Sequence, residues 1–155
     1  MSSRVAVSTG AQSKALGLST FAFTVCFAVW TVFAIIGIEI KQELGLNETQ
    51  FGLLVGTPIL TGSLVRLFLG VWTDQYGGRI VFPLTMLASA ASALLLSYAD
   101  TYLMLLLASL GLGLAGGGFA VGVAYVSKWY PQERQGAALG FFGMGNVGAA
   151  VTKFA

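Results

Sequence analysis

Long apolar runs dominate this sequence and constrain its fold more than any other feature. A helix needs about 20 consecutive apolar residues to cross the hydrocarbon core of a bilayer. Five stretches of the chain approach or exceed that length, and we predict that each is a membrane-spanning α-helix. The runs cover residues 16–38, 50–73, 80–98, 102–127 and 136–155, within a bundle at 15–155.

The composition supports a membrane protein over a soluble one. The chain is 56% hydrophobic and only 9% charged, whereas soluble domains carry about 25% charged residues. So few charges cannot cover a globule of 155 residues with a wetted surface. The predicted fold class is therefore all-α and transmembrane. A net charge of +2 is too small to indicate a nucleic-acid partner.

The distribution of basic residues predicts how the bundle is oriented. Positively charged loops stay on the cytoplasmic side of a membrane, and lysine and arginine alternate here between loops on opposite sides. One side collects five of them and the other side only Lys41. We therefore predict a cytoplasmic amino-terminal tail at 1–14 and a multi-pass protein of the cytoplasmic (inner) membrane. The five cytoplasmic residues are Arg4, Lys14, Arg79, Lys128 and Arg134.

The residue types needed for most enzyme mechanisms are missing. The sequence has no histidine, the commonest general base and metal ligand. Its one cysteine, Cys26, lies in an apolar run and provides neither a disulfide framework nor a metal-ligand pair. We predict no catalytic residues, no metal and no cofactor, and so a protein that is not an enzyme.

Arg66 is the most informative charged residue, because it lies inside the second apolar run. It is eight residues before Asp74, which is roughly 12 Å along a helix. Insertion scales put the cost of an arginine at a helix centre at about 2.5–3.5 kcal/mol, and such residues usually face a bundle interior. The alternative is that Arg66 extends to the cytoplasmic headgroups. A planar guanidinium matches a small planar oxyanion, so we predict an anion site.

The segment from Gly70 to Arg79 has the spacing G-x-x-x-D-x-x-G-x-R, which includes Asp74 and Gly77. Its glycines permit a tight turn, and Arg79 offers a counter-charge to Asp74. This segment resembles the loop signature of the major facilitator superfamily, which has twelve helices in two halves. The resemblance implies a conformational latch formed by Gly70, Asp74, Gly77 and Arg79. The alternative is an ordinary solvated turn.

A closer resemblance involves the glycine-rich fourth and fifth runs. The segments at 115–120, 129–136 and 143–148, the last of which reads GMGNVG, together resemble the nitrate/nitrite porter family. Arg66, which follows the small-residue segment 60–65, is similar to that family's second-helix arginine. The chain would then be an amino-terminal fragment that contains the first five of twelve helices. Its last run stops at residue 155 without a polar flank, which agrees with a fragment.

The resemblance implies a substrate site. Arg66 would hold the anion, Phe119 would stack on its flat face, and Asn146 would line the site with Gly143 and Gly145. Simple packing is the alternative for Phe119, and a helix–helix hydrogen bond is the alternative for Asn146. Lys153 departs from the family pattern. It could be a second cation at the site, a proton carrier, or a lysine that extends to the headgroups.

The function implied is secondary transport of nitrate, nitrite or both by alternating access. Exchange of the two anions and symport with protons both stay open. The other partners expected are the lipid bilayer and the missing carboxy-terminal half of the protein. The alternatives are a facilitator for another small anion, such as an organic acid or phosphate, and a non-transporting membrane sensor on the same scaffold.

Overall fold

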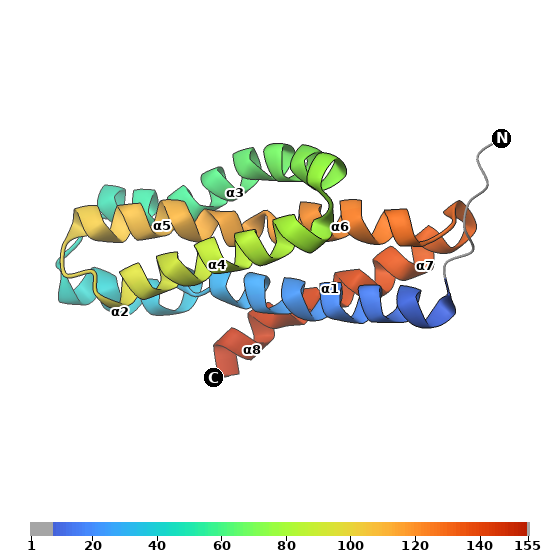
Figure 1. The fold of residues 1–155 in the computed structure, drawn as a ribbon. Helices are drawn as coiled ribbons and strands as arrows, with labels where there is room; N and C mark the ends of the chain where they lie inside the picture. The colour runs from blue at the N-terminus through green and yellow to red at the C-terminus, as the bar shows by residue number, and fades with distance from the viewer. Residues whose placement is uncertain (1–7, 155) are drawn as a thin grey trace.

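The protein forms an elongated bundle of helices, which the computed structural model describes for residues 8–154 except for the side chains of Phe33 and Ala34 (Figure 1). Every element in this range is helical, which confirms the all-α prediction. The elements are α1 (Thr9–Trp30), α2 (Phe33–Glu43), α3 (Glu48–Tyr76), α4 (Gly78–Ser97), α5 (Tyr102–Gly116), α6 (Gly118–Trp129), α7 (Gln132–Gly143), the 3₁₀ turn η1 (Met144–Val147) and α8 (Gly148–Phe154).

Within residues 8–154, four helical segments are long and apolar enough to cross a membrane. They are Thr9–Glu43, Glu48–Tyr76, Gly78–Ser97 and Tyr102–Trp129. The first joins α1 to α2, and the last joins α5 to α6. These segments make the chain a multi-pass membrane protein by length and composition.

The first helix begins earlier in the chain than the apolar run from which it was predicted. It starts at Thr9, inside the segment 1–14 that the sequence assigned to a tail. Ser8 caps it, because the Ser8 hydroxyl accepts a hydrogen bond from the Ala11 N–H at 3.3 Å. A polar first turn can therefore be helical without being apolar. Residues 1–7, including Arg4, lie outside the described part of the chain.

The predicted run at 136–155 is not one uniform α-helix. It corresponds to most of α7, followed by η1 and α8. The 3₁₀ turn falls on the glycine-rich sequence GMGNVG and includes Gly145 and Asn146. Glycine is a weak helix former, and a 3₁₀ stretch inside a helix often marks a functional hinge or a sequence under strain.

The core has two apolar clusters with a glycine-rich layer between them. One cluster includes Phe23, Leu69 and Phe142, and the other includes Leu54 and Leu112. Along α3 and along the α5–α6 segment, glycines lie between the two clusters. The backbones of neighbouring helices can therefore approach most closely in the middle of the bundle.

Gly62 of α3 and Gly113 of α5 form the closest part of that layer. A Cβ atom on Gly62 would lie 3.0 Å from the Gly113 carbonyl oxygen, and a Cβ atom on Gly113 would lie 3.0 Å from the Gly62 nitrogen. Neither backbone atom can rotate away as a side chain would. Two glycines are therefore what permits α3 and α5 to cross here.

Gly148 of α8 makes a similar approach to α1. A Cβ atom there would collide with the carbonyl oxygen of Thr24, and it would lie 3.0 Å from the Ala28 nitrogen. The Thr152 hydroxyl, one turn later, donates a hydrogen bond to the Ala28 carbonyl oxygen at 2.9 Å. These contacts hold α8 against α1 through their backbones.

We predict that Gly148→Ala destabilises the complete protein, because its methyl group meets backbone atoms that cannot move aside. Overpacking of this kind costs about 1–3 kcal/mol, so the thermal unfolding temperature in detergent should fall. Gly140→Ala is the matched control, because a Cβ atom at Gly140 meets nothing within 4 Å. Equal unfolding temperatures for the two variants would contradict this packing.

Candidate functional site

Arg66 lies on α3 with its guanidinium turned toward the middle of the helix. Its Nε–H donates a hydrogen bond to the Gly62 carbonyl oxygen at 3.2 Å. Helical side chains lean toward the amino terminus of their helix, and in α3 that direction leads away from Asp74. The Arg66 side chain is therefore bonded one turn deeper into the bundle, in the direction opposite to the predicted cytoplasmic loop.

The position of Arg66 around α3 places it beside the helix contacts. Residues four apart in an α-helix are about 40° apart around its axis. Gly62 is buried against Gly113 and Trp30, so Arg66 borders the face of α3 that meets α1 and α5. The Arg66 side chain is exposed in the described part of the chain. It thus lies at the edge of a packed face with room beside it.

Phe119 of α6 lies at the edge of an aromatic cluster. Its ring centroid is 5.4 Å from that of Phe23 and 5.8 Å from that of Phe142. Phe23 and Phe142 stack at 4.9 Å with an interplanar angle of 29°. Both are almost completely buried, whereas Phe119 is 41% exposed. The Phe119 ring is therefore supported on one side and open on the other.

Three aromatic residues form one face of α1, which the sequence pattern alone did not reveal. Phe23, Phe27 and Trp30 have the i, i+4, i+7 spacing that puts side chains on one face of a helix. Their consecutive ring centroids are each 5.5 Å apart. The signal was present in the first apolar run, where an aromatic stripe is easily taken for general hydrophobicity. This face extends from the Phe119 cluster to Trp30, which contacts Gly62.

The glycine-rich segment at 143–148, with the sequence GMGNVG, has a packed side and an open side. Gly145 is buried, and a Cβ atom there would meet the Phe23 ring and lie 3.2 Å from the Thr20 carbonyl oxygen. A Cβ atom at Gly143 would meet nothing within 4 Å. Asn146 is exposed, and its Nδ2 donates a hydrogen bond to the Gly143 carbonyl oxygen at 2.9 Å. Gly145 therefore packs against α1, while Gly143 and Asn146 face open space.

Lys153 lies near the end of α8, with an exposed side chain. The residue before it, Thr152, is anchored to α1 through Ala28. Neither of the two ion pairs found among residues 8–154 includes Lys153. Its predicted roles therefore stay open.

Four of the six predicted substrate residues form two groups in the structure, and Arg66 and Lys153 belong to neither. Phe119 and Gly145 share contacts with Phe23, and Asn146 bonds to Gly143. Arg66 bonds to Gly62, which lies beside Trp30 at the far end of the aromatic face of α1. Within residues 8–154, no hydrogen bond or ion pair joins Arg66 to the residues of either group. A common anion site for all of them stays a prediction.

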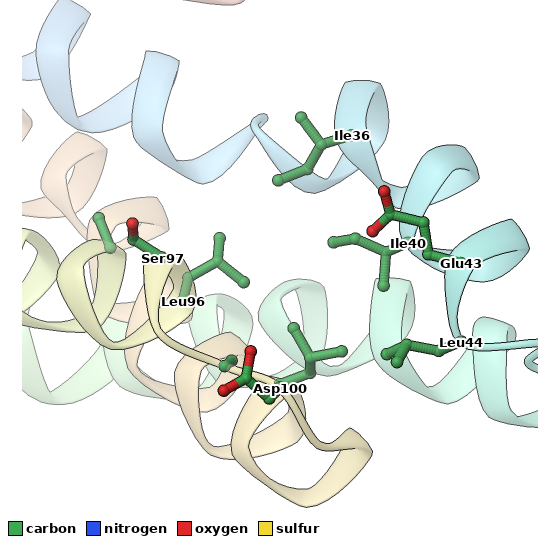
Figure 2. Close-up of a pocket in the computed structure, with 10 residues that line it drawn as sticks. Ile36, Ile40, Glu43, Leu44, Leu96, Ser97 and Asp100 are labelled. Carbon is green, nitrogen blue, oxygen red and sulfur yellow. The ribbon is translucent and has the colours of Figure 1, made fainter.

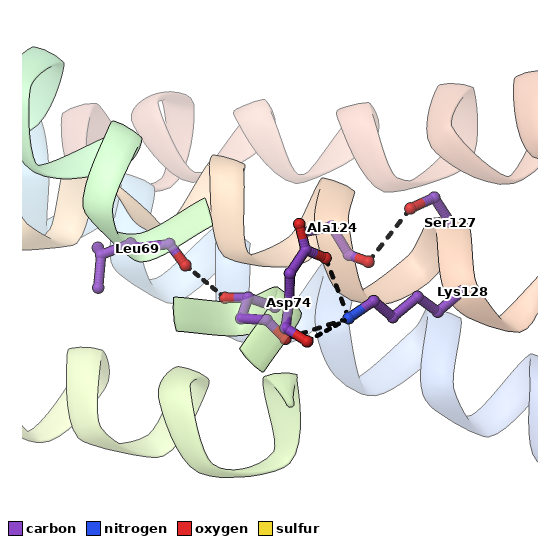
Figure 3. A network of polar contacts seen from close by, with 6 residues as sticks. Leu69, Asp74, Ala124, Ser127 and Lys128 are labelled. Atoms are coloured by element: carbon purple, nitrogen blue, oxygen red, sulfur yellow. Dashed lines mark hydrogen bonds and ion pairs between the residues drawn. The ribbon is translucent and has the colours of Figure 1, made fainter. Parts of the chain in front are cut away.

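The predicted latch residue Asp74 is paired with the end of α6. Its Oδ1 lies 3.0 Å from Lys128 Nζ, and Nζ also donates hydrogen bonds to the carbonyl oxygens of Asp74 at 3.0 Å and Thr73 at 3.4 Å (Figure 3). Lys128 therefore provides positive charge at the carboxy-terminal end of α3, where a helix dipole favours a cation. The sequence had assigned the counter-charge of Asp74 to Arg79.

The rest of the latch segment also contacts α6. Gly77, between α3 and α4, has φ of 83°, a conformation that favours glycine. Arg79 places its guanidinium carbon 5.9 Å from the ring centroid of Trp129, a cation–π distance. Gly70 has open space where a Cβ atom would be. The turn is thus fixed against α6 by Lys128 and Trp129, two residues that lie far from it in the sequence.

A hollow of about 460 Å³ lies near the ends of α2, α4 and α5 (Figure 2). Its walls are mainly apolar, with Glu43 and Asp100 as its two carboxylates. Two negative charges disfavour an anion there, and none of the predicted substrate residues lines it. Among the described residues, no three His, Cys, Asp or Glu side chains are grouped so as to hold a metal ion.

Comparison with known proteins identifies close relatives. Residues 18–152 match the family model of the Major Facilitator Superfamily. The chain is 48% identical over 141 residues to a probable nitrate/nitrite antiporter of Thermus thermophilus, covering 91% of this chain and 32% of the relative. It is 37% identical over 146 residues to a probable nitrate/nitrite transporter of Mycobacterium tuberculosis strain H37Rv, covering 92% and 37%.

A third relative is the nitrite extrusion protein of Bacillus subtilis. The chain is 31% identical to it over 144 residues, which is 93% of this chain and 36% of the relative. The chain therefore spans about a third of the length of the curated relatives it matches.

We predict that Phe23→Ala destabilises the complete protein strongly, because Phe23 contacts Phe27, Phe119 and Phe142 and is only 1% exposed. Truncation of a buried phenylalanine costs about 3–5 kcal/mol. Phe21→Ala on the same helix is the control, since Phe21 is 68% exposed. Unfolding in mixed detergent micelles measures both losses, and equal losses would show that the aromatic face is not a core.

Proposed function

We propose that this chain, which belongs to the major facilitator superfamily, is the amino-terminal part of a nitrate/nitrite porter, a transporter that moves nitrate, nitrite or both. Transport occurs by alternating access, in which two halves rock around a substrate near the middle of the membrane. This chain provides one wall of the substrate site, and the remainder of the protein provides the other.

The bonding of Arg66 is the observation that carries this proposal. One guanidinium donor, the Nε–H, is used by the Gly62 carbonyl oxygen. The N–H donors of the two terminal amino groups stay available for a ligand. A planar, permanently charged pair of amino groups fits two oxygens of a planar anion better than it fits a sugar or a cation. Nitrate and nitrite are planar anions of this kind.

Phe119 and Asn146 provide the second part of the proposed site. Phe119 offers a ring supported from behind by Phe23 and Phe142 and open on its other side. Asn146 is exposed beside Gly143. An aromatic face and an amide suit the flat face and the edge of nitrate. Both residues come from helices that pack on α1, so movement of these helices would change the site.

Exchange of nitrate for nitrite is the coupling that this part of the protein favours. The chain has six acidic residues, and each lies near a helix end in the described structure. A proton-coupled carrier would use a carboxylate near the substrate to carry the proton. Nothing at the depth of Arg66 in this chain offers that group, although Lys153 and the remainder of the protein stay candidates.

The contacts at one end of the bundle support a cytoplasmic amino terminus. The Gln12 amide donates a hydrogen bond to the Trp129 carbonyl oxygen at 2.8 Å, so the start of α1 lies beside the end of α6. Lys128 pairs with Asp74 at the α3–α4 turn. The segments that carry Lys14, Arg79 and Lys128 therefore meet at one end, which the positive-inside rule assigns to the cytoplasm of the inner membrane.

Arg66→Lys should reduce nitrate uptake by at least about tenfold in proteoliposomes that contain the complete protein. The charge is kept, but the planar pair of donors is lost, and hydrogen bonds to charged groups contribute about 1.5–3 kcal/mol. Arg134→Lys is the control, because Arg134 is exposed at the start of α7. Normal uptake by Arg66→Lys would remove Arg66 from the site. Uptake of an organic acid or phosphate in place of nitrate would favour a different facilitator.

Asp74→Asn should lower the maximal transport rate more than the nitrate affinity, because Asp74 is far from Arg66 and bonds to Lys128. Both side chains of this pair are largely solvent-exposed, and such a pair contributes about 0–1 kcal/mol. It can therefore open and close during transport. Lys128→Gln should reproduce the defect, and Glu133→Gln, at a neighbouring exposed carboxylate, should not. A loss of affinity with a normal maximal rate would contradict the latch.

A further inference from the structure

Trp30 occupies the point where three spanning segments meet. It is the last residue of α1, and its indole Nε1–H donates a hydrogen bond to the Pro58 carbonyl oxygen of α3 at 3.2 Å. A Cβ atom on Gly116 of α5 would lie 2.8 Å from the same nitrogen. The indole therefore fills the space that glycine leaves on α5 while it bonds to the backbone of α3.

Pro58 makes the bonded segment of α3 unusual. Proline has no backbone N–H, so the hydrogen bond from residue 58 to the Leu54 carbonyl oxygen is missing in the turn that leads into Pro58. An α-helix weakened at one turn needs external contacts to keep a fixed geometry. Trp30 provides one of them at Pro58, and Gly113 provides the next by close contact with Gly62. The turn from Pro58 to Gly62, which follows the weakened turn, is thus held from α1 and from α5.

That turn carries the acceptor that orients Arg66. The Gly62 carbonyl oxygen receives the Nε–H of Arg66, so the position of Gly62 sets where the guanidinium plane lies. Because Nε is engaged, the guanidinium offers its two terminal amino groups to a ligand, end on. A side-on approach that uses Nε would require the bond to Gly62 to break.

We propose that Trp30 and Gly62 are positioning residues, which fix the direction of Arg66 so that a planar oxyanion is bound end on by its two terminal amino groups. This inference rests on the proposed function, in which Arg66 binds nitrate. Trp30 acts through the Pro58–Gly62 turn and does not itself need to touch the anion. Glycine is required at position 62 because any side chain there would press on Gly113 and Trp30 and displace the carbonyl acceptor.

The test uses the complete protein with bound ¹⁵N-nitrate, studied by infrared difference spectroscopy and by titration calorimetry. The antisymmetric stretch of free nitrate is doubly degenerate, and binding of two of its oxygens splits it. Trp30→Phe keeps a ring but removes the Nε1–H, so we expect the splitting to change and nitrate affinity to fall about two- to tenfold, the range of one hydrogen bond. Trp72→Phe is the control, since Trp72 is half exposed on the same bundle.

Gly62→Ala is a second variant, and Gly56→Ala is its control on the same helix. A Cβ atom at Gly56 meets nothing within 4 Å. We expect the splitting to change in Gly62→Ala and to be normal in Gly56→Ala. A wild-type spectrum in both Trp30→Phe and Gly62→Ala would overturn the positioning role, even with weaker binding. Failure of the proposed function is separate: the wild type would then bind no nitrate, or Arg66→Lys would bind it with an unchanged spectrum.

Discussion

A guanidinium within a membrane-spanning helix is costly, so such a residue usually faces the bundle interior or a water-filled cavity and pairs with backbone carbonyl groups. In this protein, Arg66 gives one of its N–H donors to the carbonyl oxygen of Gly62. That oxygen is available in a fixed place because Gly62 is pressed against Gly113 and Trp30. The close approach of α3 to α5 at Gly62 and the charge of Arg66 are thus neighbouring features of α3, because the same glycine permits the approach and accepts the hydrogen bond from Arg66.

The glycines of this protein have two different physical roles. Gly62, Gly113, Gly145 and Gly148 are places where a methyl group would meet another helix, and they set the distances between spanning segments. Gly143 has open space beside it. Within the 3₁₀ turn, Gly145 faces Phe23 while Asn146 stays exposed. The turn η1 therefore packs against α1 through Gly145 and exposes the Asn146 side chain on its opposite side. Packing alone would not require a polar side chain there.

The sequence was enough to predict the helical fold and the family, because long apolar runs, loop charges and two motifs are local patterns. It also identified Arg66 from its position in an apolar run. It could not show that Asp74 pairs with Lys128, since that contact depends on how α3 and α6 end side by side. The spacing also could not show that Gly145 packs against α1 while Gly143 has open space beside it, because this difference arises from the 3₁₀ turn. The role of Trp30 depends on three helices that meet.

The position of nitrate in an experimental structure of the complete protein is the most direct test of whether Arg66 binds the anion. Two nitrate oxygens should lie within hydrogen-bond distance of the two terminal amino groups of Arg66, with its Nε still bonded to Gly62. Nitrate bound elsewhere, with Arg66 directed to lipid headgroups, would contradict a binding role for Arg66.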